Sequence, residues 1–181
     1  MKYFSLLAFI ILTACSQPKD YLVEQVKDGD TLVVSINGKS ETVQLLGIDA
    51  PENTENPKLN LDINKKGMNK ADLLTLGNLA TDYLKAVLLL SDNRVDLQGD
   101  LSQRDKYGRI PMLVFGADAL SLNEKMVAEG YAIVLNSAVL EPNFKTKLNT
   151  FESQAIKYMN GLWRSHRNLA QQWAGKTSLE N

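Results

Sequence analysis

The stretch "TVQLLGIDAPE", residues 42–52, places an apolar, strand-like run directly before two carboxylates and a proline. It follows "TLVVSI" (31–36), a β-branched run typical of a strand, and "NGK" (37–39), which is typical of a tight hairpin turn. Another strand-like run, "YLVEQV" (21–26), and the turn "DGD" (28–30) come earlier. The chain therefore opens as a β-meander whose third strand ends in acidic side chains.

Helical patterns follow the meander at three places. Apolar residues recur with helical spacing over about 71–90. Ser121 and Glu124 form a capping-box pattern for a second helix, which Gly130 ends. Residues 143–160 predict a third helix, whereas the polar segment 53–70 has no period and predicts a mobile loop.

The segments "RVDLQG" and "RIPMLVF" complete a set of five strands. Five strands with three helices in this order predict an α+β protein with an OB-fold, five-stranded β-barrel. The 181 residues, 44% of them hydrophobic, are enough for one globular domain with a real core. We assign this domain to residues 21–163 and a C-terminal tail to 164–181, and we expect a monomer.

The first residues, "MKYFSLLAFIILTAC", have the layout of an export signal, with Lys2 before a short apolar run. The run is too short for a transmembrane helix, which needs roughly 20 apolar residues. "LTAC" resembles the lipobox of bacterial lipoproteins. This predicts a signal peptide at 1–14 and a lipidated Cys15 with a short tether at 15–20, although a plain secretory signal is the alternative. The protein is then a membrane-anchored lipoprotein of the cell envelope, in the outer membrane if the source is Gram-negative.

Carboxylates gather where the predicted strands end. Asp28 and Asp30 precede the second strand, and Asp49 and Glu52 follow the third, so the hairpin brings them to one rim of the barrel. Crowded carboxylates repel one another, and a divalent cation removes that repulsion. Hard oxygen ligands without Cys or His favour Ca²⁺ or Mg²⁺. Solvated turn aspartates are the alternative.

A basic motif, "RDKYGR" (104–109), lies between the last two predicted strands. Arg109 can hold a phosphate through its guanidinium fork, and Tyr107 can contact a sugar or base. The formal net charge of −1 lacks the strongly basic balance of many nucleic-acid binders, so a polyanion needs a local cationic patch.

"DGDT", "LLGIDAPE" and "DKYGR", with "NEKMVAEGYA" and "NGLW" further on, together resemble the staphylococcal nuclease (thermonuclease) family. That family has an OB-fold barrel and cleaves the phosphodiesters of DNA and RNA with Ca²⁺. The resemblance implies that Asp30, Asp49 and the backbone carbonyl of Ala50 bind Ca²⁺.

The resemblance also assigns roles around the metal. Glu52 matches the acid that positions or activates the attacking water, and Arg109 matches the arginine that stabilises charge on the phosphate. Lys106 and Tyr107 match residues that contact the nucleotide. No catalytic histidine is needed, and the single one, His166, lies in the tail.

Three positions depart from the family pattern. Gln44 stands where the family usually has a catalytic arginine, Leu79 where it often has a glutamate, and "VLNS" (134–137) lacks the usual stacking aromatic. Efficient catalysis therefore does not follow from the resemblance. We expect a Ca²⁺-dependent nuclease with reduced activity, and the alternatives are a catalytically impaired nucleic-acid-binding OB-fold module and an envelope scaffold for protein contacts.

Overall fold

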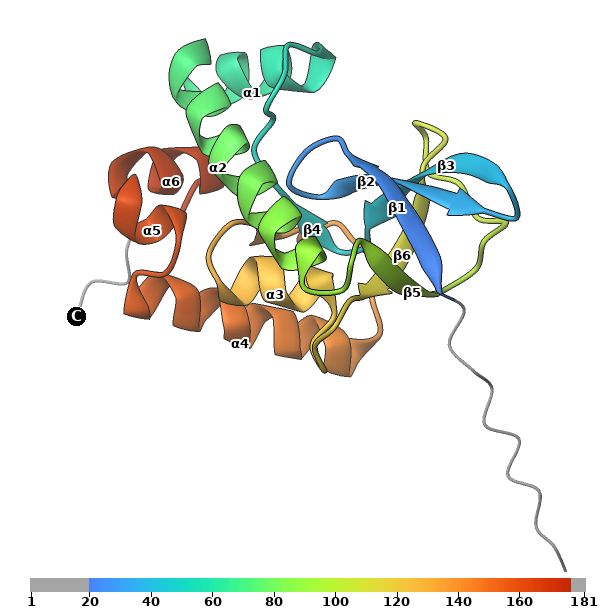
Figure 1. Ribbon diagram of the computed structural model, residues 1–181. Coiled ribbons are helices and arrows are strands. Elements are labelled where there is room, and N and C mark those ends of the chain that lie inside the picture. Colours follow the sequence, from blue (N-terminus) through green and yellow to red (C-terminus); the bar gives the residue numbers. More distant parts are fainter. Residues whose placement is uncertain (1–19, 177–181) are drawn as a thin grey trace, which may run out of the picture.

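The computed structural model describes residues 20–176, which form a closed five-stranded barrel with helices packed against it (Figure 1). The strand order around the barrel is β1-β2-β3-β6-β5. The barrel strands are β1 (Tyr21–Val26), β2 (Thr31–Ile36), β3 (Lys39–Leu45), β5 (Arg94–Gln98) and β6 (Ile110–Phe115). The predicted α+β, OB-type barrel is confirmed.

A short two-stranded sheet lies beside the barrel. Its strands are β4 (Ile48–Asp49) and β7 (Ile133–Val134), and Asp49 pairs with Ile133. This pairing fixes the backbone at the end of the "LLGID" segment. It therefore sets the direction in which the chain leaves toward Glu52.

Six helices occur within residues 20–176, against the three predicted. They are α1 (Pro57–Lys66), α2 (Lys70–Leu89), α3 (Leu122–Ala128), α4 (Pro142–Tyr158), α5 (Leu162–Ser165) and α6 (Arg167–Ala174). The predicted capping box is present, with the Ser121 side chain and the Glu124 side chain each accepting from the other's backbone N–H. None of these helices is long and apolar enough to cross a membrane.

The prediction of a mobile loop over 53–70 was wrong, because its middle is α1. Asn56 caps the helix by accepting a hydrogen bond from the Leu59 backbone N–H, and Pro57 occupies the first turn. Gly67 ends it in a left-handed conformation, with φ of 63°. Leu59 is the one buried residue of α1, which explains the missing apolar period.

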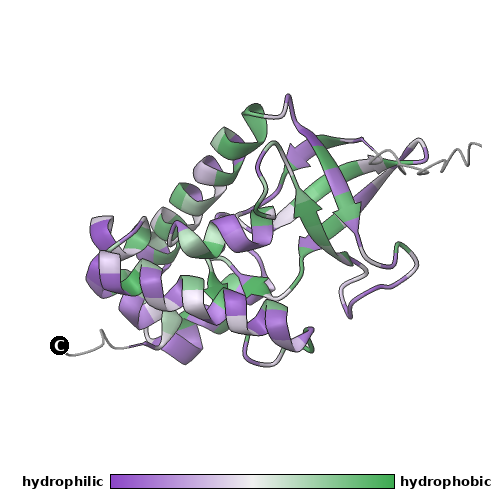
Figure 2. Ribbon diagram, turned by 90° about the horizontal axis from the view of Figure 1, so that it is seen from below, coloured by the Kyte–Doolittle hydropathy of each residue, from purple (hydrophilic) through white to green (hydrophobic). Residues whose placement is uncertain are grey.

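Two hydrophobic clusters share α2. The first fills the barrel, and along β6 buried residues alternate with partly exposed ones. Figure 2 shows hydrophobic and hydrophilic segments on the barrel strands. The second joins α1, α2, α5 and α6 around the buried Trp163 and Trp173. In Figure 1, α2 runs from the barrel to this second group of helices. The tail that we expected from residue 164 is thus helical to Ala174 and packed through Trp173.

Candidate active site

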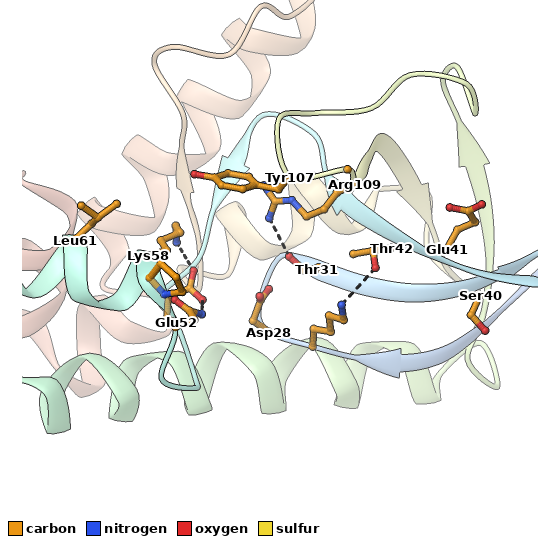
Figure 3. A pocket seen from close by; sticks show the side chains of 14 residues that line it. Asp28, Thr31, Ser40, Glu41, Thr42, Glu52, Lys58, Leu61, Tyr107 and Arg109 are labelled. Carbon is orange, nitrogen blue, oxygen red and sulfur yellow. Dashed lines mark hydrogen bonds and ion pairs between the residues drawn. The ribbon is translucent and has the colours of Figure 1, made fainter.

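A pocket of about 520 Å³ opens beside the hairpin of β2 and β3. Figure 3 shows side chains entering it from three directions: the hairpin, the turn before β6, and the first turn of α1. Residues from all three line it: Asp28, Thr31, Glu52, Lys58, Tyr107 and Arg109. The sequence segments singled out by their charge therefore meet at one concave surface.

The "DGD" turn holds Asp30 in a buried position behind this pocket. The Asp28 carboxylate accepts a hydrogen bond from the Asp30 backbone N–H at 3.0 Å, which closes the turn. The Asp30 carboxylate in turn accepts from the Ala50 N–H and from the Thr31 hydroxyl, both at 2.8 Å. Asp30 thus links the second strand directly to the "IDAPE" segment.

Helix α2 supports both acidic segments through small residues. A Cβ added to Gly29 would lie 2.8 Å from the Cβ atoms of Ala50 and Ala80. A Cβ added to Gly77 would lie 2.1 Å from the Glu52 carbonyl oxygen. The backbones of the two acidic segments therefore rest on α2 at places where only glycine fits.

Three oxygens from the "IDAPE" segment converge on one cation, the ammonium of Lys58. Its Nζ lies 2.9 Å from Asp49 Oδ1, 2.5 Å from Glu52 Oε1 and 3.3 Å from the Ala50 carbonyl oxygen. The ammonium donates hydrogen bonds to Glu52 Oε1 and to the Ala50 carbonyl oxygen, and it forms an ion pair with Asp49. Figure 3 shows Lys58 reaching Glu52 from α1.

The second oxygen of Glu52 is also engaged. Glu52 Oε2 accepts from the Asn56 side-chain amide at 2.5 Å, and the Asn56 carbonyl oxygen caps α1. Glu52 is buried, with 7% of its surface exposed. Its carboxylate is therefore held rigidly by the start of α1, with both oxygens paired.

Arg109 approaches the pocket from the other side. Its Nε and Nη2 each lie 2.9 Å from Asp105 Oδ2, and Nη1 lies 3.4 Å from the Thr31 hydroxyl (Figure 3). The Tyr107 ring lies 5.3 Å from the guanidinium carbon and is largely exposed. Asp105 orients the arginine, while the open ring presents a flat apolar surface at the pocket.

Gln44 does not line the pocket but lies directly behind it. It is buried opposite Thr31 in the β2–β3 register, and its Oε1 is 3.1 Å from the Thr31 hydroxyl. Thr31 therefore contacts Gln44, Asp30 and Arg109 together.

The pKa values of three groups report this electrostatic arrangement. Burial, and then the nearby Asp28 and Asp49, raise the pKa of the Asp30 carboxyl well above its ordinary value. Burial alone would lower the pKa of Lys58, but Asp49, Asp30 and Glu52 outweigh it and raise that pKa. Burial likewise favours neutral Asp105, yet hydrogen bonds from Arg109 hold its pKa below the usual range.

The structure brings together most of the predicted site residues. Glu52, Tyr107 and Arg109 line the pocket, while Asp30, Asp49, Ala50 and Gln44 lie immediately behind or beside it. Lys106 is exposed and lies 4.9 Å from the Tyr107 ring, but it does not line the pocket. Cys15 lies outside the described residues.

Two contributors were missed by the sequence analysis, Lys58 and Asn56. The only signal for them was the cap pattern "NPK" at 56–58, which starts α1 and turns both side chains toward Glu52.

The donor atoms suit a hard metal ion, although they currently surround an ammonium. Among residues 20–176, no three His, Cys, Asp or Glu side chains lie close enough to form a metal site by themselves. The oxygens of Asp49, Ala50 and Glu52 nevertheless meet at one cation. Oxygen ligands without sulfur or imidazole are those preferred by Ca²⁺. The donor set therefore fits a hard divalent cation.

Comparisons with known proteins agree with this site. The family described as "Staphylococcal nuclease homologue" matches residues 42–165, more than half of the chain. The thermonuclease of Staphylococcus intermedius is 31% identical over 147 residues, which cover 80% of this chain and 76% of that protein. An Escherichia coli protein named "Uncharacterized endonuclease" is 29% identical over 164 residues, covering 90% of this chain and 89% of its own length.

A second thermonuclease, from Staphylococcus hyicus, is 29% identical over 145 residues, which cover 79% of this chain and 75% of that protein. The fold, the site and these matches define an OB-fold protein of nuclease type. The chain belongs to the staphylococcal nuclease family. The names of these relatives support an activity on nucleic acids.

Proposed function

We propose that this protein is a Ca²⁺-dependent nuclease that hydrolyses phosphodiester bonds of DNA and/or RNA at the cell envelope, with reduced activity. The observation that carries the proposal is the convergence of three oxygens on one cation position in a pocket that also contains Arg109. The oxygens favour a hard cation, and the guanidinium favours an anionic substrate. A metal cation and a guanidinium group can together stabilise the negative charge that grows on a phosphate during hydrolysis.

Asp30, Asp49 and the Ala50 carbonyl would hold the metal. When bound, Ca²⁺ supplies positive charge next to the phosphoryl oxygens of the substrate. Glu52 would orient or deprotonate the attacking water, because its carboxylate lines the pocket next to Asp49 and Ala50. Arg109, kept in place by Asp105, would neutralise charge on the phosphate.

Tyr107 would contact the sugar or base next to the cleaved bond. Its ring is exposed at the pocket. The ring centre lies 4.9 Å from the Lys106 ammonium nitrogen and 5.3 Å from the Arg109 guanidinium carbon. Such a cation-bearing aromatic surface suits single-stranded nucleic acid, whose bases stack without regard to sequence.

Gln44 is the reason to propose a slow enzyme. It is uncharged and it contacts Thr31, the residue that also contacts Arg109. A guanidinium at this place would add a second positive group behind the phosphate site. The same observation favours the second candidate function, an OB-fold module that binds nucleic acid but hardly cleaves it.

Residues 1–20 carry the rest of the proposal. We infer from "LTAC" that Cys15 is lipidated and that the domain is held at a membrane by the short tether at 15–20. The substrate is then nucleic acid outside the cytoplasm, and the protein acts as a monomer.

Digestion of supercoiled plasmid and of single-stranded RNA, each with Ca²⁺ and with chelator, tests the function. We expect cleavage of at least one substrate with Ca²⁺ and none with chelator. Glu52→Gln and Arg109→Ala should each lower the rate by about 10²-fold or more. Binding of both substrates without any cleavage would favour the binding module instead.

A further inference from the structure

Lys58 lies where the family's metal is expected, on a helix that the sequence did not predict. It is the second residue of α1, and Pro57 and the Asn56 cap fix the start of that helix. Its ammonium contacts Asp49, the Ala50 carbonyl and Glu52 at 2.9, 3.3 and 2.5 Å. These are two of the three proposed metal ligands and the proposed base.

The ammonium and a divalent ion cannot share these oxygens. The ammonium donates to Glu52 Oε1 and to the Ala50 carbonyl and is ion-paired with Asp49. A Ca²⁺ ion would need the Asp49 and Ala50 oxygens at about 2.3–2.6 Å, where the ammonium now lies against them. Two cations at one position also repel each other strongly in a half-buried site. The site can therefore hold either Lys58 or the metal.

On the basis of the proposed function, we propose that the Lys58 side chain competes with Ca²⁺ for the same position. The metal then binds only after the Lys58 ammonium leaves Asp49 and Glu52. The side chain has room to leave, because it is 35% exposed and lines the pocket. The move needs a rotation of one side chain and no unfolding of α1. The released charge then faces the pocket in which the polyanion binds.

The competition also controls Glu52. With Lys58 in place, Glu52 Oε1 is paired with a cation and Oε2 accepts from the Asn56 amide, so both oxygens already have a partner that competes with water. Departure of Lys58 frees Oε1, while Asn56 keeps the carboxylate oriented. Metal binding and release of the base are thus one event.

Calorimetric titration of the full chain with Ca²⁺ tests the competition. Lys58→Gln should tighten Ca²⁺ binding by about 10–100-fold. In wild type, one or two charge-assisted hydrogen bonds hold the Lys58 ammonium in the metal position, so only a small fraction of the molecules can bind Ca²⁺ at once. Lys58→Arg keeps the charge and should bind more weakly than Lys58→Gln. Lys65→Gln removes an exposed charge from the same helix and should change the affinity by no more than about twofold. Thermal melts in chelator establish that each variant is folded.

The outcomes separate this inference from the proposed nuclease function. If Lys58→Gln binds Ca²⁺ no more tightly than wild type while both cleave nucleic acid with Ca²⁺, competition is overturned and the nuclease stands. If Lys58→Gln binds more tightly but neither protein cleaves, competition stands and the nuclease fails. If wild type cleaves in chelator and Lys58→Gln does not, Lys58 is itself the catalytic cation, and both competition and Ca²⁺ dependence are wrong. If neither protein binds Ca²⁺, both proposals are wrong.

Discussion

The contact between Gly77 and the Glu52 backbone gives the sharpest link between the sequence and the site. An alanine Cβ at Gly77 would lie 2.1 Å from the Glu52 carbonyl oxygen, 2.3 Å from its carbon and 2.6 Å from the Asn53 nitrogen. Real Cβ contacts do not fall below 3.0 Å, so the Glu52–Asn53 peptide or α2 must move by about 0.9 Å. The obstacle is backbone, which cannot rotate away.

Gly77→Ala should therefore destabilise the protein although alanine is the better helix former. Helix propensity favours alanine by about 1 kcal/mol, and overpacking costs about 1–3 kcal/mol. Because backbone must shift, we expect an overpacking cost of about 2–3 kcal/mol and so a net loss of about 1–2 kcal/mol, or about 2–8 °C in Tm for a domain of this size. A displacement of Glu52 by about 1 Å should also slow cleavage by about 10²-fold.

The assays are thermal melts in chelator and cleavage rates at saturating Ca²⁺. Asn78→Ala, an exposed change in the next position of α2, is the matched control and should stay within about 0.5 kcal/mol of wild type. A Gly77→Ala protein that is as stable and as active as wild type would show that Glu52 is not positioned by α2.

Three further changes test other parts of the site. Asp30→Asn should raise Tm in chelator and abolish the Ca²⁺-dependent rise in Tm. Burial raises the pKa of Asp30 above its ordinary value, so the folded wild-type protein binds this proton more tightly than the unfolded chain and loses stability in chelator as pH rises through the folded-state pKa. The variant has no such carboxyl group and should not show this loss of stability. A lower Tm for Asp30→Asn would contradict this. Gln44→Arg should raise the cleavage rate by about tenfold or more, well below the roughly 10³–10⁵-fold effect of arginine fingers. The control Gln103→Arg, at an exposed position, should not raise the rate. If Gln44→Arg leaves the rate unchanged or lowers it, another cation already stabilises the phosphate charge. Cys15→Ala should abolish acyl labelling and membrane fractionation, and a variant still labelled and membrane-bound would refute the lipobox.

Short-range patterns in the sequence predicted the parts of the fold that depend on local chemistry. The β-branched strand at 31–36, the "NGK" hairpin and the capping box of Ser121 and Glu124 all occur as expected. The site could be anticipated for the same reason, since the hairpin register that pairs Thr31 with Gln44 brings the "DGD" and "IDAPE" segments together.

Features that depend on tertiary contacts could not be found in this way. Helix α1 buries only Leu59, so it has no apolar period, although Asn56, Pro57 and Gly67 are typical cap residues. Glycine is a poor helix former, yet Gly77 is required in α2 where the Glu52 backbone lies against the helix. The "NPK" cap pattern predicts only where α1 starts, whereas the position of Lys58 between Asp49 and Glu52 depends on how α1 packs against the rest of the chain.

The central claim is that a divalent ion held by Asp30, Asp49 and the Ala50 carbonyl turns on phosphodiester hydrolysis, and a Ca²⁺ titration of cleavage tests it most directly. The full chain is freed of metal with chelator and returned stepwise to Ca²⁺, while hydrolysis of a single-stranded oligonucleotide is followed. The account predicts no hydrolysis in chelator and a rate that saturates at the Ca²⁺ concentration that half-fills the site in calorimetry, with Asp49→Asn inactive throughout. A rate that is the same with chelator and with Ca²⁺, or that persists in Asp49→Asn, would contradict it.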